Sequence, residues 1–163
     1  MVRFGIGYDI HRFEKDRKLM LGGVEIAHDK GLAGHSDADV VIHAICDALL
    51  GALGKGDIGE HFPNTQDAYK NISSLLLLQR VQTIIEADGY RIGNIDTVLQ
   101  AEEPKLNKYK EAMKKTIAKA LAIDASLINI KATTMEGLGA IGNKEGIAAF
   151  ACAILEEKKG DAD

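Results

Sequence analysis

The sequence predicts an α/β (α+β) fold: a single domain over residues 1–163, with one mixed four-stranded sheet, a small N-terminal hairpin and helices on one face. Three observations predict this fold. First, 163 residues with 46% hydrophobic content suit one compact domain. Second, apolar and polar residues alternate with a period of two at the N-terminus, as in a half-buried strand. Third, strand-like segments alternate with helical periodicity beyond the hairpin, which is typical of a sheet covered by helices.

The predicted strands are short runs of apolar residues bounded by turns. The first alternates from Val2 to His11, and a second is interrupted by Gly22-Gly23, which suggests the hairpin. The last run is almost continuously apolar, so we expect it to be buried on both faces. We expect residues 156–163 to form a solvated tail. The predicted strands cover residues 2–11, 18–26, 92–101, 127–134 and 147–155.

Three helices are predicted, each from apolar residues that recur every three to four positions. They cover residues 37–53, 72–88 and 107–121. Ser36 or Asp37 is the expected N-cap of the first helix, because short polar side chains accept hydrogen bonds from the free amides of a first turn.

Composition excludes several functional classes. The net charge is −4 and there is no basic tract, so we expect no nucleic-acid partner. No apolar stretch reaches about 18 residues, so we expect no membrane span. Cys46 and Cys152 are expected to be buried free thiols. The chain opens directly on a strand, which favours a cytoplasmic protein, or a plastid-type organelle protein whose transit peptide has been removed.

Asp9 and His11 form the first candidate for chemistry. They lie two apart on the first predicted strand and therefore share one face. That face also carries Gly5 and Gly7, which we interpret as open space beside the two polar groups. A carboxylate and an imidazole are ligands for a borderline metal such as zinc, whose catalytic sites usually take three protein ligands. An isolated Asp-x-His pair is, however, more often an ion pair or a solvated pair.

His43 is the obvious third ligand. Asp39, His43 and Asp47 recur at a spacing of four, so they should form a second stripe on the first helix. This arrangement would direct a row of titratable groups towards one place.

Polar residues in three further loops suggest phosphate chemistry. His35 and Ser36 precede the first helix, and Asp57 and Gly59 follow it. A later segment, Lys131-Ala-Thr-Thr-Met-Glu136, offers two hydroxyl donors for a phosphate and a hard oxygen suited to Mg²⁺ or Mn²⁺. No phosphate-binding glycine loop, dinucleotide fingerprint or Ser–His–Asp order is present. The combination indicates diphosphate chemistry without a covalent nucleophile.

Several separated motifs resemble one family in order and spacing, the 2-C-methyl-D-erythritol 2,4-cyclodiphosphate synthases. The resemblance covers the chain from Arg3 to about Leu155. The motifs are Gly-Tyr-Asp-Ile-His-Arg-Phe at 7–13, Gly-His-Ser-Asp-Ala-Asp at 34–39, His-Ala-Ile-Cys-Asp-Ala-Leu-Leu-Gly-Ala at 43–52, Gly-Asp-Ile-Gly at 56–59, Phe-Pro-Asn-Thr at 62–65 and Lys-Ala-Thr-Thr-Met-Glu-Gly-Leu-Gly at 131–139.

The resemblance implies an activity. A phosphorus–oxygen lyase of this family converts 4-diphosphocytidyl-2-C-methyl-D-erythritol 2-phosphate to 2-C-methyl-D-erythritol 2,4-cyclodiphosphate and releases CMP, in the non-mevalonate isoprenoid precursor pathway. It further implies a homotrimer with sites between subunits. From the residues alone, two other readings stay open: a metal-dependent phosphohydrolase, and a non-catalytic binder of isoprenoid diphosphates.

The resemblance also implies roles for individual residues. One Zn²⁺ per subunit would be held by Asp9, His11 and His43, and a second divalent ion, Mg²⁺ or Mn²⁺, by Glu136. His35 and Thr134 would stabilise the transition state. The implied substrate-binding set is Asp9, His11, His35, Ser36, Asp57, Ile58, Gly59, Phe62, Pro63, Asn64, Thr65, Gln66, Ala101, Lys105, Leu106, Thr133, Thr134, Glu136, Ala140 and Asn143.

Some positions depart from the family pattern. Asn64 and Gln66 stand where the family usually carries acidic residues. Ala140 and Asn143 replace the usual Phe and Arg in a loop that lines a central cavity linked to an isoprenoid diphosphate. His28 and His61 match no motif, so we expect both at the surface.

Overall fold

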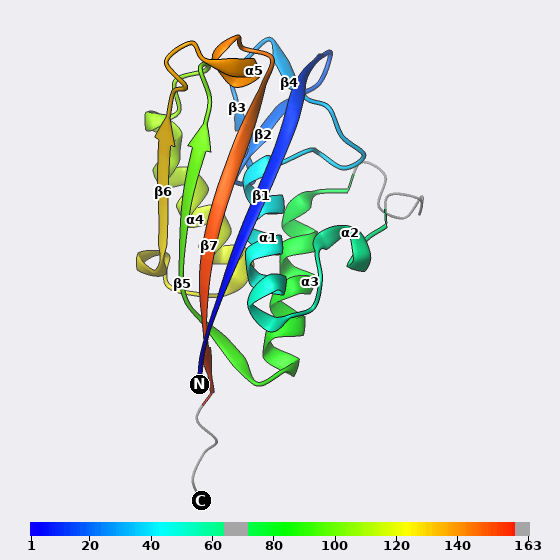
Figure 1. The fold of residues 1–163 in the computed structure, drawn as a ribbon, viewed down its shortest axis with the longest axis vertical. Coiled ribbons are helices and arrows are strands. Elements are labelled where there is room, and N and C mark those ends of the chain that lie inside the picture. Colours follow the sequence, from blue (N-terminus) through cyan, green and yellow to red (C-terminus); the bar gives the residue numbers. More distant parts are fainter. Residues whose placement is uncertain (64–71, 159–163) are drawn as a thin grey trace, which may run out of the picture.

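The computed structural model describes residues 1–63 and 72–158. A mixed five-stranded sheet, with strand order β4-β1-β7-β5-β6, forms its centre, and β2 pairs with β3 in a separate hairpin (Figure 1). The strands are β1 (Val2–Lys15), β2 (Leu19–Leu21), β3 (Val24–Ile26), β4 (Lys30–Leu32), β5 (Tyr90–Gln100), β6 (Ile128–Thr133) and β7 (Gly146–Glu157).

The fold class is confirmed, but the main sheet has five strands rather than four. The additional strand is β4, a Lys-Gly-Leu segment that pairs antiparallel with the end of β1 through Phe13↔Leu32. Three residues that include a glycine are too few to show the alternation by which strands are recognised. The predicted tail begins too early, because Glu156 and Glu157 belong to β7; residues 159–163 lie outside the described residues.

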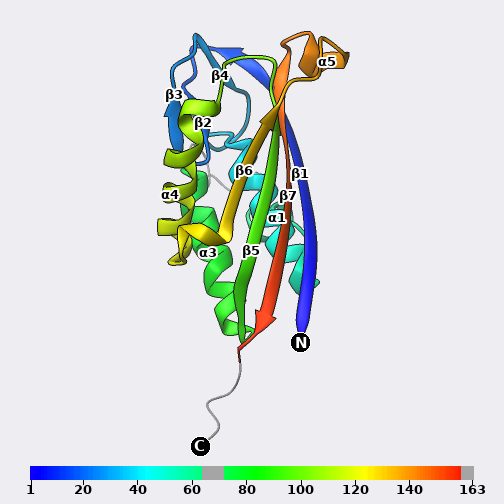
Figure 2. The same ribbon diagram turned by 90° about the vertical axis from the view of Figure 1, so that its left-hand side faces the viewer.

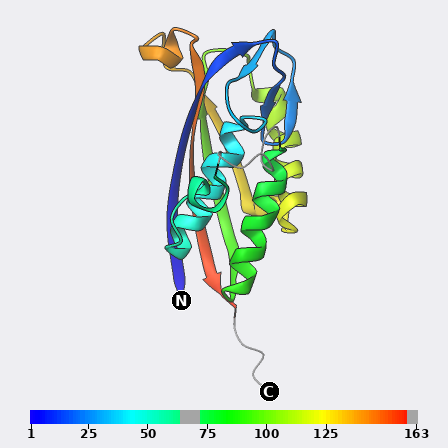
Figure 3. The same ribbon diagram turned by 90° about the vertical axis from the view of Figure 1, so that its right-hand side faces the viewer.

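The long helices all cover the same face of the sheet, as predicted. Figures 2 and 3 show this layer edge-on from opposite sides. The helices are α1 (Val40–Leu53), α2 (Ile58–His61), α3 (Ser74–Ala87), α4 (Lys110–Leu121) and α5 (Gly139–Gly142), with short 3₁₀ turns at Asn107–Tyr109 and Ala125–Leu127. None of the helices in the described part of the chain has the length and apolar character needed to cross a bilayer.

Strand β7 lies in the middle of the sheet, antiparallel to both β1 and β5. Its residues at 147, 149, 151, 153 and 155 face the helices and are buried. The prediction that both faces are buried is wrong for this chain alone, because Phe150 on the opposite face keeps 36% of its surface exposed.

Helix α1 lies directly against β1, and the two glycines of that strand allow the contact. A Cβ at Gly5 would lie 2.0 Å from the Ala48 carbonyl oxygen, and a Cβ at Gly7 would lie 2.0 Å from that of Ala44. The interpretation of these glycines as open space is therefore wrong. The space that side chains would fill is taken by helix backbone, which brings α1 close to the strand that carries Asp9 and His11.

The N-cap of α1 is Asp39, not Ser36 or Asp37. Its side chain accepts hydrogen bonds from the backbone N–H groups of Val41 and Ile42, both at 3.2 Å. The same carboxylate accepts from Gly22 N at 2.9 Å and Gly23 N at 2.6 Å. Asp39 thus joins the β2–β3 turn to the start of α1. It is fully buried in this role and does not extend a row with His43 and Asp47.

Candidate metal centre and substrate pockets

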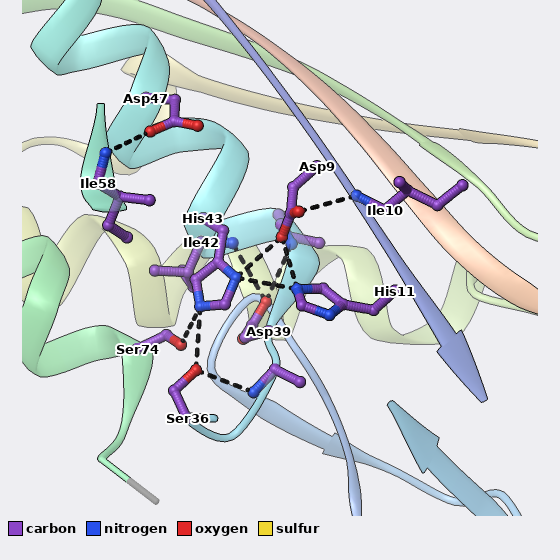
Figure 4. Close-up of polar contacts among 12 residues, drawn as sticks. Asp9, Ile10, His11, Ser36, Asp39, Ile42, His43, Asp47, Ile58 and Ser74 are labelled. Carbon is purple, nitrogen blue, oxygen red and sulfur yellow. Dashed lines mark hydrogen bonds and ion pairs between the residues drawn. The ribbon is translucent and has the colours of Figure 1, made fainter. Parts of the chain in front are cut away.

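Three side chains converge where β1 passes the first turn of α1 (Figure 4). Asp9 Oδ2 lies 2.8 Å from His11 Nε2 and 2.9 Å from His43 Nδ1. The two imidazole nitrogens are 3.3 Å apart. The strand period places Asp9 and His11 on the helix-facing side, and His43 reaches them from the helix. The three residues identified from the sequence therefore do come together.

The donor set suits a transition metal. One ligand atom from each of Asp9, His11 and His43 lies within 4.8 Å of the others. Ligands at the usual zinc distances are about 3.3–3.6 Å apart at the corners of a tetrahedron. The separation of the two imidazole nitrogens, 3.3 Å, falls in this range, whereas Asp9 Oδ2 lies closer to them, at the hydrogen-bonding distances of 2.8 and 2.9 Å. A carboxylate with two imidazoles matches catalytic zinc sites that keep a fourth position open.

Electrostatics keep the Asp9 carboxylate ionised. Burial by itself would raise the pKa of Asp9, but the hydrogen bonds from His11 and His43 outweigh burial and hold that pKa well below its usual range. Burial opposes protonation of His11, yet the contact with Asp9 raises the pKa of its imidazole. These shifts belong to a cluster in which imidazole N–H groups face the carboxylate from the positions that flank a cation's place.

Each imidazole uses its second nitrogen for the protein. His11 Nδ1 lies 2.6 Å from the Ala33 carbonyl oxygen, which can only accept, so Nδ1 donates and Nε2 is directed to the cluster. His43 Nε2 lies 2.9 Å from Ser74 Oγ and 3.2 Å from Ser36 Oγ. Ser74 was not identified from the sequence. It lies 31 positions beyond His43 in the sequence. The only clue to such a residue is the general rule that the second ring nitrogen of a metal-binding histidine has a hydrogen-bond partner.

A cavity of about 330 Å³ opens beside the cluster. It brings together many residues of the predicted substrate set, and they are joined by Leu77 in the first turn of α3 and by Ile72 just before that helix. The lining residues are His11, His35, Ser36, His43, Ile58, Gly59, Phe62, Pro63, Ile72 and Leu77. Asp57 is instead the N-cap of α2 and accepts from Glu60 N at 3.0 Å. Asn64, Thr65 and Gln66 lie outside the described residues.

A second, smaller cavity of about 160 Å³ lies at the ends of β5 and β6. Its lining contains five residues of the predicted set: Ala101, Lys105, Leu106, Thr133 and Thr134. Among the described lining residues, none is shared with the cavity beside the metal cluster. The sequence motifs that seemed to build one site therefore lie in two places on one chain.

Glu136 lies beside this second cavity. Its carboxylate accepts a hydrogen bond from Thr134 Oγ1 at 2.9 Å, and its backbone has a positive φ of 52°. Within the described residues, it does not belong to the Asp9–His11–His43 cluster or to another group of three metal-ligating side chains.

Ala140 lines a cavity of about 630 Å³ between α5 and the ends of β1 and β4. Arg12, Lys15, Lys30 and Lys144 also line it. Lys144 Nζ is 2.8 Å from Glu103 Oε2, an ion pair that raises the pKa of Lys144. Asn143 follows α5 as its C-cap and is exposed.

The two unmatched histidines are less exposed than predicted. His28 keeps only 10% of its side-chain surface exposed and stacks on Phe13 with ring centroids 5.0 Å apart. His61 is half-buried, and its Nε2 lies 2.8 Å from the Lys55 carbonyl oxygen. Neither belongs to the metal cluster.

The fold and the site define a class: α/β proteins with a sheet covered on one face and an Asp-x-His strand motif completed by a histidine from a helix. Comparison with known proteins narrows that class. The YgbB family pattern matches residues 2–156. The chain belongs to the YgbB family.

Two sequence relatives bear the same name. A protein of Clostridium botulinum (strain Kyoto / Type A2), named 2-C-methyl-D-erythritol 2,4-cyclodiphosphate synthase, is 56% identical over 155 residues, which cover 95% of this chain and 100% of that protein. A Clostridioides difficile (strain 630) protein of the same name is 55% identical over 154 residues, 94% of this chain and 96% of its own length.

Solved structures agree with this relationship. The bifunctional IspDF of Campylobacter jejuni aligns with a TM-score of 0.93 at 43% identity over 96% of this chain, which spans only 42% of that longer protein. The IspF of Plasmodium falciparum, solved as a CDP complex, aligns with a TM-score of 0.85 at 38% identity over 97% of both chains.

Proposed function

We propose that this chain is a metal-dependent phosphorus–oxygen lyase of the non-mevalonate isoprenoid precursor pathway. It converts 4-diphosphocytidyl-2-C-methyl-D-erythritol 2-phosphate to 2-C-methyl-D-erythritol 2,4-cyclodiphosphate with release of CMP. One observation carries the proposal: the Asp9–His11–His43 cluster opens into a cavity lined by His35 and Ser36, in a chain whose relatives bear the name of this synthase.

The reaction is an intramolecular displacement. An oxygen of the 2-phosphate forms a bond to the β-phosphorus, while the bond from that phosphorus to the bridging oxygen breaks and CMP leaves with the electron pair. A phosphate is already a nucleophile and CMP is a competent leaving group, so positioning and charge neutralisation supply most of the acceleration. No covalent enzyme intermediate is required.

The residues around the two cavities bind and orient the substrate. Imidazole and hydroxyl groups of His35 and Ser36 hold the methylerythritol phosphate end beside the metal cluster. The hydroxyls of Thr133 and Thr134 donate to the diphosphate, and the pocket walls formed by Ala101, Lys105 and Leu106 receive the cytosine. His35 and Thr134 stabilise the charge that develops in the transition state.

Asp9, His11 and His43 would hold Zn²⁺, and Glu136 would hold Mg²⁺ or Mn²⁺. When bound, such ions neutralise phosphate charge and act as Lewis acids. The nitrogen-containing donor set supports zinc at the first position, and a carboxylate oxygen beside the Thr134 hydroxyl supports a harder ion at the second.

The proposed assembly is a homotrimer with each active site between two subunits. Two features support it. On one chain, the described lining of the cavity beside the Asp9–His11–His43 cluster shares no residue with that of the smaller cavity at the ends of β5 and β6. In addition, β1 and β7 expose an apolar face opposite the helices, which monomers rarely leave uncovered. Its residues are Val2, Phe4, Ile6, Tyr8, Ile10 and Phe150, with exposed fractions of 66, 63, 62, 46, 48 and 36%.

The proposed partners are therefore the small cytidine diphosphate substrate and further copies of the same chain. We propose no nucleic-acid partner and no membrane partner. The proposed compartment is the cytoplasm, or a plastid-type organelle if a transit peptide has been removed.

A product assay with synthetic substrate tests the function. Stoichiometric release of CMP and cyclodiphosphate, without inorganic phosphate, is the expected result at enzyme concentrations far below that of the substrate. Inorganic phosphate as a product would indicate a phosphohydrolase instead, and product formation at these enzyme concentrations would exclude a non-catalytic isoprenoid diphosphate binder.

A further inference from the structure

A chain of hydrogen bonds extends from His43 away from the metal cluster. Ser74 Oγ, 2.9 Å from His43 Nε2, is itself hydrogen-bonded to Asp37 Oδ1. The backbone N–H of Ser74 donates to Asp37 Oδ2 at 3.0 Å. Ser74 is fully buried at the start of α3, and Figure 4 shows its hydroxyl facing the His43 ring on the side opposite Asp9. His43 is thus linked to a carboxylate through one serine.

Donor and acceptor counting fixes the direction of this chain. A carboxylate only accepts hydrogen bonds, so the single hydroxyl hydrogen of Ser74 is donated to Asp37. The oxygen of Ser74 is then left to accept, and its donor is His43 Nε2–H. A ring that keeps this proton on Nε2 when a metal displaces the hydrogen on Nδ1 presents the Nδ1 lone pair to the metal, and Nδ1 is the atom that lies 2.9 Å from Asp9 Oδ2 and 3.3 Å from His11 Nε2 in the cluster.

We infer that Asp37, acting through Ser74, is a positioning residue that fixes His43 in the tautomer whose Nδ1 can bind the metal. Ser36 does not supply this function as well. Its hydroxyl lies farther from His43 Nε2, at 3.2 Å, and also accepts from Ala38 N. The inference rests on the proposed metal role of the cluster. Partners of this kind typically change metal affinity by about 10–100-fold.

Zinc affinity, measured by competition with a chelator, tests the inference without an activity assay. We expect Ser74→Ala and Asp37→Asn each to weaken zinc binding by about 10–100-fold. The asparagine can turn its amide nitrogen towards Ser74, which would reverse the donor order. Ser73→Ala is the matched control, because Ser73 is the exposed neighbour and its side chain makes no capping hydrogen bond. We expect the affinity of this control to stay within about twofold of the unmodified protein.

Nuclear magnetic resonance of the zinc-loaded protein shows which nitrogen of His43 carries the proton, and a general loss of stability would not move that proton. In the unmodified protein, the His43 Nε2 proton should be observable and protected from exchange with solvent. In Asp37→Asn the same proton should exchange faster. This second comparison tests the role of Asp37 even if Ser74→Ala does not fold. Unchanged zinc affinity in Asp37→Asn, or an unprotonated Nε2 in the loaded unmodified protein, would overturn the inference. If the unmodified protein binds no zinc, the proposed metal role itself fails.

Discussion

Substitution of Gly7 by alanine tests whether α1 really contacts β1 through backbone. The new Cβ would lie 2.0 Å from the Ala44 carbonyl oxygen and 2.7 Å from Ala48 N, whereas ordinary contact begins at 3.4 Å. Neither group can rotate away, so strand and helix must separate by roughly 1.4 Å, the difference between 3.4 and 2.0 Å. Overpacking of this kind typically costs about 1–3 kcal/mol, and we expect the upper end because both neighbours are backbone.

Two measurements follow from this displacement. At about 2–4 °C per kcal/mol for a chain of this size, the midpoint of thermal unfolding should fall by roughly 6–12 °C at fixed protein concentration. The metal site should suffer as well, because β1 carries Asp9 and His11 while α1 carries His43. Functional geometry tolerates only about 0.5 Å, so zinc affinity should fall at least about tenfold.

Gly51→Ala, in α1, is the control for Gly7→Ala in β1. A Cβ at Gly51 would have one neighbour, the Ile6 carbonyl oxygen, at 3.7 Å. Since alanine is favoured over glycine inside a helix by about 1 kcal/mol, this variant should be as stable as the unmodified protein or more so. An unfolding midpoint for Gly7→Ala equal to that of the control, with intact zinc binding, would refute the proposed contact between strand and helix.

Three further predictions concern the proposed metal, assembly and cavity. His43→Ala should lose zinc and activity but keep its fold; undiminished zinc by metal analysis would contradict the ligand assignment. Mixed Asp9→Ala and Glu136→Ala subunits should regain activity in a turnover assay, and no recovery after demonstrated subunit exchange would place each site within one chain. The unmodified protein should bind farnesyl diphosphate weakly or not at all in calorimetric titration, and Asn143→Arg should improve binding roughly 10–100-fold, the equivalent of about 1.5–3 kcal/mol for a charged hydrogen bond. Tight binding without gain from the arginine would show that this loop is misinterpreted.

The sequence was sufficient where a feature depends on local periodicity. Alternation in the first strand places Asp9 and His11 on one face, and the structure confirms that they meet. The succession of strands and long helices along the chain, apart from β4, and the position of these helices on one face follow equally from periodicity. The identity of His43 as their neighbour came from the motif that contains it, which the structure also brings into contact.

Tertiary contacts decided the features that the sequence could not show. Ser36, Asp37 and Asp39 are all acceptable N-caps, and the selection of Asp39 depends on amides of Gly22 and Gly23 from a distant turn. From the sequence alone, Gly7 is equally compatible with open space beside the strand and with close contact to another backbone. Only the position of α1 decides between them. The same holds for the split between two cavities, since linear motifs do not tell which of their residues face each other within one chain.

Strand β1 has a property that concerns length rather than composition. It pairs with β7 without interruption from Val2↔Glu156 to Arg12↔Gly146, so its side chains alternate strictly between the two faces of the sheet. Insertion or deletion of one residue in this segment would exchange the faces beyond that point. Asp9 and His11 would then turn to the side opposite α1, and Ile10, which lies between them, would turn towards that helix. Among sequences that fold this way, β1 should therefore vary in residue type far more readily than in the number of residues between its start and His11.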